Sequence, residues 1–249
     1  MGVHLSFAPV LDVNSESKNP IIGVRSFGDD PKMVTQHGMA FMEGLQANGI
    51  WAVAKHFPGH GAALQDSHLH LPLINRSKKA LDTHDLFPFK HLIRHDLKGI
   101  MVGHLSIPAL TKNTKQPVSV AHEVVTHLLQ KQLGFKGLVF TDALNMKGVT
   151  DQVKHPSLAT FLAGADVLLL PENLTKAIAA LKSNYLNGTI TEKRLAHSVK
   201  KILRAKYELG LSQSKQNSKV ETLPFGLVDR YLLREIANQS VVLCHKSTN

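Results

Sequence analysis

Residues 51–61 read Trp-Ala-Val-Ala-Lys-His-Phe-Pro-Gly-His-Gly, a short apolar run that ends in Lys55 and His56 and then turns. Four more apolar runs, rich in branched residues, lie at 5–11, 100–104, 138–142 and 167–170. The segments between the runs carry Leu and Val at three- and four-residue spacing, which is typical of amphipathic helices. Strands that alternate with helices predict βαβ units and a parallel sheet.

The polar residues that close these runs distinguish between two parallel-sheet folds. Asp12, Lys55 with His56, His104 and Asp142 each lie at the end of a different run. An open doubly wound sheet concentrates its ligand at one switch point, whereas a (β/α)8 barrel collects functional residues from the ends of several strands. The spread therefore predicts an α/β protein of the (β/α)8 TIM-type barrel class. Five of the eight strand-helix units that such a barrel needs are recognisable.

The composition excludes several classes of protein. A chain of 249 residues with 43% hydrophobic residues can bury a core, so it is neither disordered nor collagen-like. Its single cysteine, Cys244, excludes an internal disulfide framework. The most apolar run, near 167–171, is far shorter than the roughly 18–20 residues that a membrane-spanning helix needs, so we expect no membrane insertion.

The net charge of +10 lies mostly in the last third of the chain. After residue 175, Lys and Arg outnumber Asp and Glu by 13 to 5, against 16 to 14 before it. These basic residues are spread over helical segments and lack the interleaved aromatic residues that stack on nucleic-acid bases. We therefore expect a solvated basic surface and no nucleic-acid partner.

The chain is expected to divide into a barrel region and a shorter second region. Residues 1–211 contain the strand-helix units, and residues 212–224 begin with a Ser-, Gln- and Lys-rich stretch typical of a linker. Residues 225–249 follow, with a predicted helix at 228–237 and a predicted strand at 240–244.

A histidine-rich loop follows the run at 51–57. In it, Asp66 and His68 are two residues apart, a spacing that allows the carboxylate to bind the imidazole, fix its tautomer and raise its basicity. Such a histidine can both donate and accept a proton near neutral pH. Two alternatives remain at this point: solvated loop histidines, or a site for zinc or another divalent ion. The zinc donors would come from His56, His60, Asp66, His68 and His70. The spacing does not match a helical His-Glu-x-x-His motif, and Lys55 would place a positive charge beside the cation.

Three further charged residues are candidates for a polar site. Asp142 ends the run at 138–142 and could be a nucleophile, a general base, a metal ligand or the partner of a lysine. Asp12 has the same position after its own run. Arg25 lies in a glycine-flanked turn at 23–28, which suits either an arginine reaching into a pocket or a surface loop.

Four motifs together resemble glycoside hydrolase family 3, and most closely its β-N-acetylglucosaminidase branch. They lie, in the family's order and spacing, at 7–13, 23–28, 55–68 and 134–142. The resemblance spans about residues 3–210. It implies that Asp142 is the nucleophile and that His68 with Asp66 is the acid/base dyad. It implies further that the hydroxyls of the terminal sugar are held by Asp12, Arg25, Lys55 and His56. We expect the strand-end His104 to join these substrate-binding residues, and we expect no cofactor and no metal.

The resemblance implies a retaining exo-β-N-acetylglucosaminidase that acts on small glycans such as peptidoglycan fragments or muropeptides, with a cell-envelope location favoured. The alternatives are a β-glucosidase, a glycoside phosphorylase, or a sugar-binding fragment without activity. Three strand-helix units are expected to precede the run at 5–11, and 225–249 resembles the start of an α/β sandwich domain. The expected partners therefore include the remaining parts of a longer parent chain, without which the 249 residues should have little activity.

Overall fold

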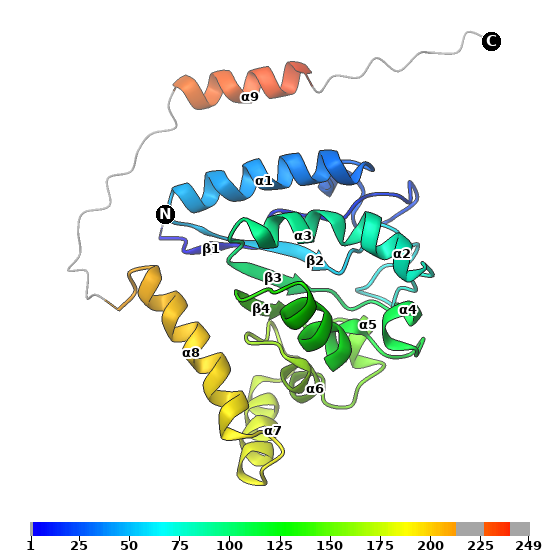
Figure 1. Ribbon diagram of the computed structural model, residues 1–249, viewed down its shortest axis with the longest axis vertical. Helices are drawn as coiled ribbons and strands as arrows, with labels where there is room; N and C mark the ends of the chain where they lie inside the picture. The colour runs from blue at the N-terminus through cyan, green and yellow to red at the C-terminus, as the bar shows by residue number, and fades with distance from the viewer. Residues whose placement is uncertain (1, 213–226, 240–249) are drawn as a thin grey trace. The chain divides into compact units, whose positions relative to one another are not determined.

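The computed structural model describes residues 2–212 and 227–239, except the side chains of 227–229. The chain divides into two compact units, Met1–Leu211 and Ser212–Asn249 (Figure 1). In the second unit the structure describes helix α9 (Leu227–Gln239), which covers the helix predicted at 228–237. The predicted linker beyond Ser212 and the predicted strand at 240–244 lie outside the described residues. No helix in the described part of the chain is both long and apolar enough to cross a membrane.

The first unit is built on a parallel sheet. Its strands are β1 (Leu5–Ser6), β2 (Trp51–Phe57), β3 (Gly99–Val102) and β4 (Leu138–Thr141). They pair in the order β1-β2-β3-β4, all parallel. Each strand is added to the same side of the sheet, and the order never reverses among the described strands. This is the order of a barrel wall and not of a doubly wound sheet.

The first and last predicted strands are less regular than the sequence suggests. The run at 5–11 is a strand only over Leu5–Ser6, because Pro9 has no N–H for the ladder. The rest of the run still lies alongside β2, since the backbone N–H of Leu11 donates to the carbonyl of Lys55 at 2.6 Å. The strand predicted at 167–170 is wrong as a regular element: Val167 forms only a bridge to Phe140. The segment nevertheless lies along β4.

Several helices of the first unit, α1 (Pro31–Ala47) and α3 (Phe87–Arg94) among them, cover the outer face of this sheet. Helix α1 starts at Asp30, whose side chain accepts from the backbone N–H of Lys32. The helical segment between β2 and β3 is divided into a π-helical turn, η2 (Leu81–Asp85), and α3. Figure 1 shows α1 and α3 side by side over the strands, consistent with their packing. The remaining elements are η1 (Gly23–Arg25), α2 (Lys78–Ala80), α4 (Pro108–Thr111), η3 (Val118–Val120), η4 (Glu123–Gln132), α5 (Lys147–Thr150), α6 (Pro156–Ala163), α7 (Leu174–Leu186) and α8 (Glu192–Glu208).

The sheet is buried on both faces. Ala52, Ala54 and Ile100 belong to a large outer cluster with the apolar residues of α1 and α3. On the opposite face, Val53, Met101 and Phe140 pack with Ala205 of α8. Successive residues of a strand point to opposite faces, which explains why β2 contributes to both clusters.

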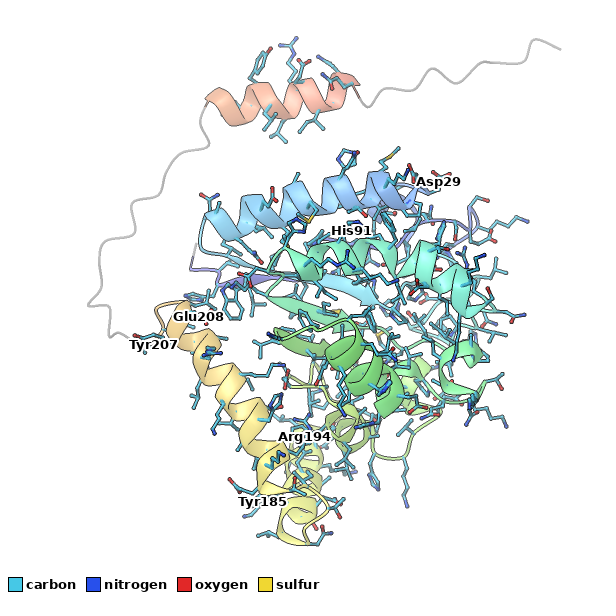
Figure 2. The ribbon with its side chains drawn as sticks, viewed as in Figure 1. Asp29, His91, Tyr185, Arg194, Tyr207 and Glu208 are labelled. Atoms are coloured by element: carbon cyan, nitrogen blue, oxygen red, sulfur yellow. The ribbon has the colours of Figure 1, made fainter. Side chains whose placement is uncertain are left out.

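Buried polar contacts fasten α8 to the sheet. The fully buried carboxylate of Asp166 accepts from the backbone N–H of Val139 at 3.0 Å and forms an ion pair with Lys201 of α8. Arg194 lies near the start of α8 (Figure 2). Its guanidinium donates to the carbonyls of Phe161 at 2.7 Å and Ala165 at 2.6 Å. These contacts leave the carboxyl ends of the strands for the candidate site.

Candidate active site

A buried carboxylate organises the turn that follows β2. Asp12 Oδ2 lies 2.7 Å from His56 Nδ1, and Asp12 Oδ1 accepts from the backbone N–H groups of His56 at 3.1 Å and His60 at 2.7 Å. Burial alone would raise the pKa of Asp12, but the histidines and their hydrogen bonds outweigh it and hold this pKa below its usual value. Asp12 therefore remains ionised and fixes both ends of the turn.

The glycine at the end of this turn meets another backbone segment. A Cβ atom built on Gly61 would overlap the carbonyl oxygen of Val13, in the loop that carries Asp12. The Gly61 carbonyl also accepts from the N–H of Glu16 at 3.3 Å. A side chain at this position would push the two loops apart.

We expect Gly61→Ala to lower the free energy of unfolding by about 3 kcal/mol or more, because the clash is with backbone that cannot rotate away. Gly44→Ala is the matched control. A Cβ atom at Gly44, in α1, meets nothing within 4 Å, and alanine should stabilise the helix by about 0.5–1 kcal/mol. Urea unfolding of both variants measures the difference. Equal stability of the two variants would contradict the close approach at Gly61.

Charged groups from four separate segments meet above the strand ends. Partial burial and the charge of Arg25 lower the pKa of Lys55, while the charges of Asp142 and Asp12 act in the opposite direction. Asp142 is only partly exposed. Its backbone N–H donates to the carbonyl of Val102 at 3.0 Å, and its Oδ1 accepts from the N–H of Ala143 at 2.8 Å. The structure thus places Arg25 and Asp142 each within electrostatic range of Lys55.

Asp66 and His68 form the hydrogen bond that their spacing predicts. His68 Nδ1 lies 2.8 Å from Asp66 Oδ1, which also accepts from the His68 backbone N–H at 2.7 Å. The slight burial of Asp66 would raise its pKa, but the hydrogen bonds from His68 lower it below the usual value. The imidazole is 61% exposed. Asp66 is therefore a permanent acceptor that orients an accessible histidine.

The loop that carries this pair rests on the segment that follows Asp142. The backbone N–H of Gly148 donates to the carbonyl of Ser67 at 3.2 Å, and that of Lys147 donates to the carbonyl of His68 at 3.4 Å. A Cβ atom at Gly148 would lie 2.8 Å from the Ser67 carbonyl oxygen, so glycine is needed for this approach. The loop of His68 and the strand end of Asp142 are thus joined by backbone hydrogen bonds.

Two predicted sugar-binding residues do not face the site. Asp12 and His104 are both 0% exposed, and each spends its polar atoms on the protein. His104 Nδ1 lies 2.7 Å from Ser119 Oγ, and its Nε2 lies 3.2 Å from the carbonyl oxygen of Ala143, beside Asp142. The expectation of direct sugar contact is therefore corrected for both residues, because a side chain without exposed surface can only position its neighbours.

The histidines do not assemble a metal site. His56 and His60 are held by Asp12, whereas His68 pairs with Asp66, and His70 is exposed. Across 2–212 and 227–239, no three His, Cys, Asp or Glu side chains lie close enough together to bind one ion. The zinc alternative therefore lacks a set of ligands in the described structure.

The structure adds residues that the sequence patterns did not single out. Ser67 is 2% exposed, and its Oγ lies 3.1 Å from His60 Nε2. Arg76, where the loop ends, donates to Asp85 Oδ2 at 3.0 Å and to Ser15 Oγ at 2.5 Å. Asp85 is buried, which raises its pKa to about 6 even though Arg76 acts against the rise. Of Ser67, Arg76 and Asp85, only Ser67 had a sequence signal for a role in the site, namely its position as a small residue between Asp66 and His68.

Each of the motifs at 7–13, 23–28, 55–68 and 134–142 contributes at least one residue to this site, and the motif at 134–142 contributes Asp142. The sequence model of the glycosyl hydrolase family 3 N-terminal domain matches residues 1–205, across all four motifs. The chain belongs to glycosyl hydrolase family 3. The N-terminal domain of this family is a TIM-type barrel, which confirms the predicted fold class.

Individual family members are similar over most of this chain. A β-hexosaminidase A from Pseudoalteromonas piscicida is 33% identical over 240 residues, which cover 86% of the chain. A family 3 β-N-acetylglucosaminidase structure from Paenibacillus superposes on all of the chain with a TM-score of 0.92 and 31% identity. The structure of the β-glucoside phosphorylase BglX superposes on 96% of it with a TM-score of 0.91 and 27% identity.

This family 3 chain is much shorter than these relatives. It spans 39% of the Pseudoalteromonas protein, 48% of the Paenibacillus chain and 45% of the phosphorylase chain. The relatives' names therefore support, but do not establish, the activity of the whole protein.

Proposed function

We propose that the protein carrying this chain is a retaining exo-β-N-acetylglucosaminidase with Asp142 as nucleophile and the His68–Asp66 pair as general acid/base. The observation that carries the proposal is an exposed histidine held by an ionised carboxylate, on a loop that is hydrogen-bonded to the segment after Asp142. A retaining glycosidase needs a nucleophile and a proton-transfer group on either side of the scissile bond. The β-hexosaminidase names of its relatives support the same substrate class.

In the first half-reaction, a carboxylate oxygen of Asp142 attacks the anomeric carbon as the bond to the leaving oxygen breaks. Protonated His68 gives its Nε2 proton to that oxygen, so the aglycone departs as an alcohol. Asp66, on Nδ1, stabilises the imidazolium before transfer and leaves Nε2 directed away from the pair. The product of this step is a covalent ester between the sugar and Asp142.

In the second half-reaction, neutral His68 accepts a proton from water at Nε2 while the water oxygen attacks the anomeric carbon. The ester bond to Asp142 breaks, which regenerates its carboxylate and releases the sugar with its original configuration. His68 thus acts as an acid and then as a base, in the manner of the second carboxyl of other retaining enzymes.

We propose that Arg25 and Lys55 hold the terminal sugar. Arg25 is exposed and Lys55 is half-buried; Lys55 lies within electrostatic range of Asp142 and Asp12, and Arg25 lies within electrostatic range of Lys55. His56 is assigned to the same task, since Asp12 occupies its Nδ1 and leaves Nε2 as the remaining polar atom of the ring. We propose small β-linked N-acetylglucosamine glycans, including peptidoglycan fragments and muropeptides, as substrates.

A glycoside phosphorylase is the second candidate, and one observation favours it. The proton-transfer group is a neutral imidazole when it acts as base, so it does not repel a phosphate dianion as a carboxylate would. Phosphate would then replace water in the second half-reaction and yield a sugar 1-phosphate. One structural neighbour is a β-glucoside phosphorylase. Its name is the reason to test a β-glucoside as a substrate beside the β-N-acetylglucosaminide.

Product analysis distinguishes these candidates. The protein would be incubated with the 4-nitrophenyl β-glycosides of N-acetylglucosamine and of glucose, each with and without 10 mM-scale phosphate, and the sugar products followed by proton NMR. The proposal expects N-acetylglucosamine, released first as the β-anomer, in both buffers. A sugar 1-phosphate would establish the phosphorylase, and preference for the glucoside would establish the β-glucosidase. Sugar binding without turnover would overturn the enzymatic proposal.

A further inference from the structure

One buried hydrogen bond links the two halves of the candidate site. His60 is 1% exposed and Ser67 is 2% exposed, and His60 Nε2 lies 3.1 Å from Ser67 Oγ. His60 belongs to the turn that Asp12 fixes through the His60 backbone N–H, whereas Ser67 lies between the two members of the dyad. The contact therefore connects the sugar-binding turn to the acid/base loop.

The Asp66–His68 loop has few other anchors. Its ring hydrogen bond and two of its backbone bonds are internal: the N–H groups of Leu69 and His70 donate to the carbonyl of Asp66 at 3.1 and 2.9 Å. Two backbone hydrogen bonds, from Lys147 and Gly148 of α5, hold residues 66–70 to the rest of the protein. The Ser67 side chain adds the only side-chain hydrogen bond between residues 66–70 and another described segment. Leu69 is 53% exposed, so burial of apolar surface contributes little at this point.

The environment of His60 also defines which nitrogen carries its proton. Burial lowers the pKa of His60 despite the charge of Asp12, so the ring is neutral and has one N–H. Its Nδ1 atom is buried and has no hydrogen-bond partner in the described structure. A buried N–H without a partner costs more than an unused acceptor nitrogen, which places the proton on Nε2. His60 therefore donates to Ser67 Oγ.

We propose that His60 is a positioning residue, which fixes the acid/base dyad over the site by holding Ser67. This inference rests on the proposed function for its catalytic readout. The Asp12 carboxylate fixes the backbone of His60, the His60 ring fixes Ser67, and Ser67 sets the place of Asp66 and His68. Neither His60 nor Ser67 touches the substrate, because both are buried. Their effect is confined to proton transfer, where a displacement of about 1 Å can cost on the order of 10²-fold in rate.

Ser67→Ala tests this inference with the removal of one atom. We expect kcat/KM for a β-N-acetylglucosaminide with a poor leaving group to fall about 10- to 100-fold, and that for a dinitrophenyl glycoside to change less than about threefold. His60→Leu should give the same pattern, and the double variant should be no worse than either single variant because both remove one contact. His60→Gln, whose amide N–H can replace Nε2–H, should restore most of the lost activity.

Hydrogen exchange supplies a readout that does not depend on turnover. In Ser67→Ala, the amides of Leu69 and His70 should exchange about tenfold faster than in the parent protein, while those of α1 stay unchanged. If the parent protein hydrolyses neither glycoside, the proposed function fails, but this exchange still tests the positioning contact. Unchanged exchange in Ser67→Ala, or equal losses on both leaving groups in an active protein, would overturn the inference. Thermal unfolding identifies any variant, His60→Leu above all, whose loss comes from global instability.

Discussion

Asp142→Asn should reduce the turnover of an aryl β-N-acetylglucosaminide on the order of 10³-fold or more, in the protein that carries this chain. The amide keeps the shape of the carboxylate but removes its charge and its nucleophilicity, so the covalent intermediate no longer forms. Asp142 contributes no apolar burial, and its Oδ1 contact with the N–H of Ala143 can be kept by the amide oxygen. Stability should therefore change little while the rate falls, as initial rates and thermal unfolding would measure.

Asp151→Asn is the matched control for this experiment. Asp151 is an exposed aspartate at the end of α5, nine positions along the chain from Asp142, and its replacement should leave the rate within about twofold because surface changes usually have small effects. Labelling with a mechanism-based fluorosugar, followed by peptide mapping, identifies the nucleophile directly. A label on a carboxylate other than Asp142 would show that the assignment is wrong.

The second large effect is expected at the dyad. With a poor leaving group, His68→Ala should lower kcat/KM by about 10²- to 10⁴-fold, since the departing oxygen then receives no proton. For a dinitrophenyl glycoside, which departs with little assistance, kcat/KM should fall less than about tenfold. Asp66→Ala should show the same dependence on the leaving group, to an equal or smaller extent, because it removes only the group that orients the ring.

Two comparisons separate acid/base catalysis from a general loss of structure. His70→Ala removes an exposed histidine from the same loop and should retain nearly full activity on both substrates. Added azide, which attacks without a base, should raise kcat of His68→Ala on the activated substrate and yield the β-glycosyl azide. Equal losses of kcat/KM on both leaving groups would instead assign His68 to substrate positioning. Loss of activity with EDTA that zinc restores would return the metal alternative to consideration.

The sequence predicted the elements of this site that depend on local spacing. The two-residue separation of Asp66 and His68 is enough to form their hydrogen bond, because a loop of that length needs no distant partner. The apolar runs at 51–57 and 138–142 predicted β2 and β4, since each alternates with an amphipathic helix. The strand-end position of Asp142 follows from the same pattern.

The regularity of the outer segments was not predictable in the same way. The run at 167–170 has the composition of a strand but forms only one bridge, at Val167. A regular strand also needs a continuous ladder of backbone hydrogen bonds to a neighbouring strand, and composition alone does not specify that ladder. Similarly, the break between η2 and α3 falls just before Phe87–Pro88, where proline lacks an N–H and disturbs the preceding turn.

The sequence by itself determined the parallel α/β fold and the local chemistry of Asp66, His68 and Asp142. These depend on periodicity and on neighbours within a few residues. Only the tertiary structure decided that Asp12 and His104 are sealed inside the protein while Arg25 and His68 are exposed. It also decided that His60 holds Ser67 and that Gly148 supports the same loop. Burial and contacts between distant segments depend on how whole elements pack, and the same residue types at strand ends are compatible with either outcome.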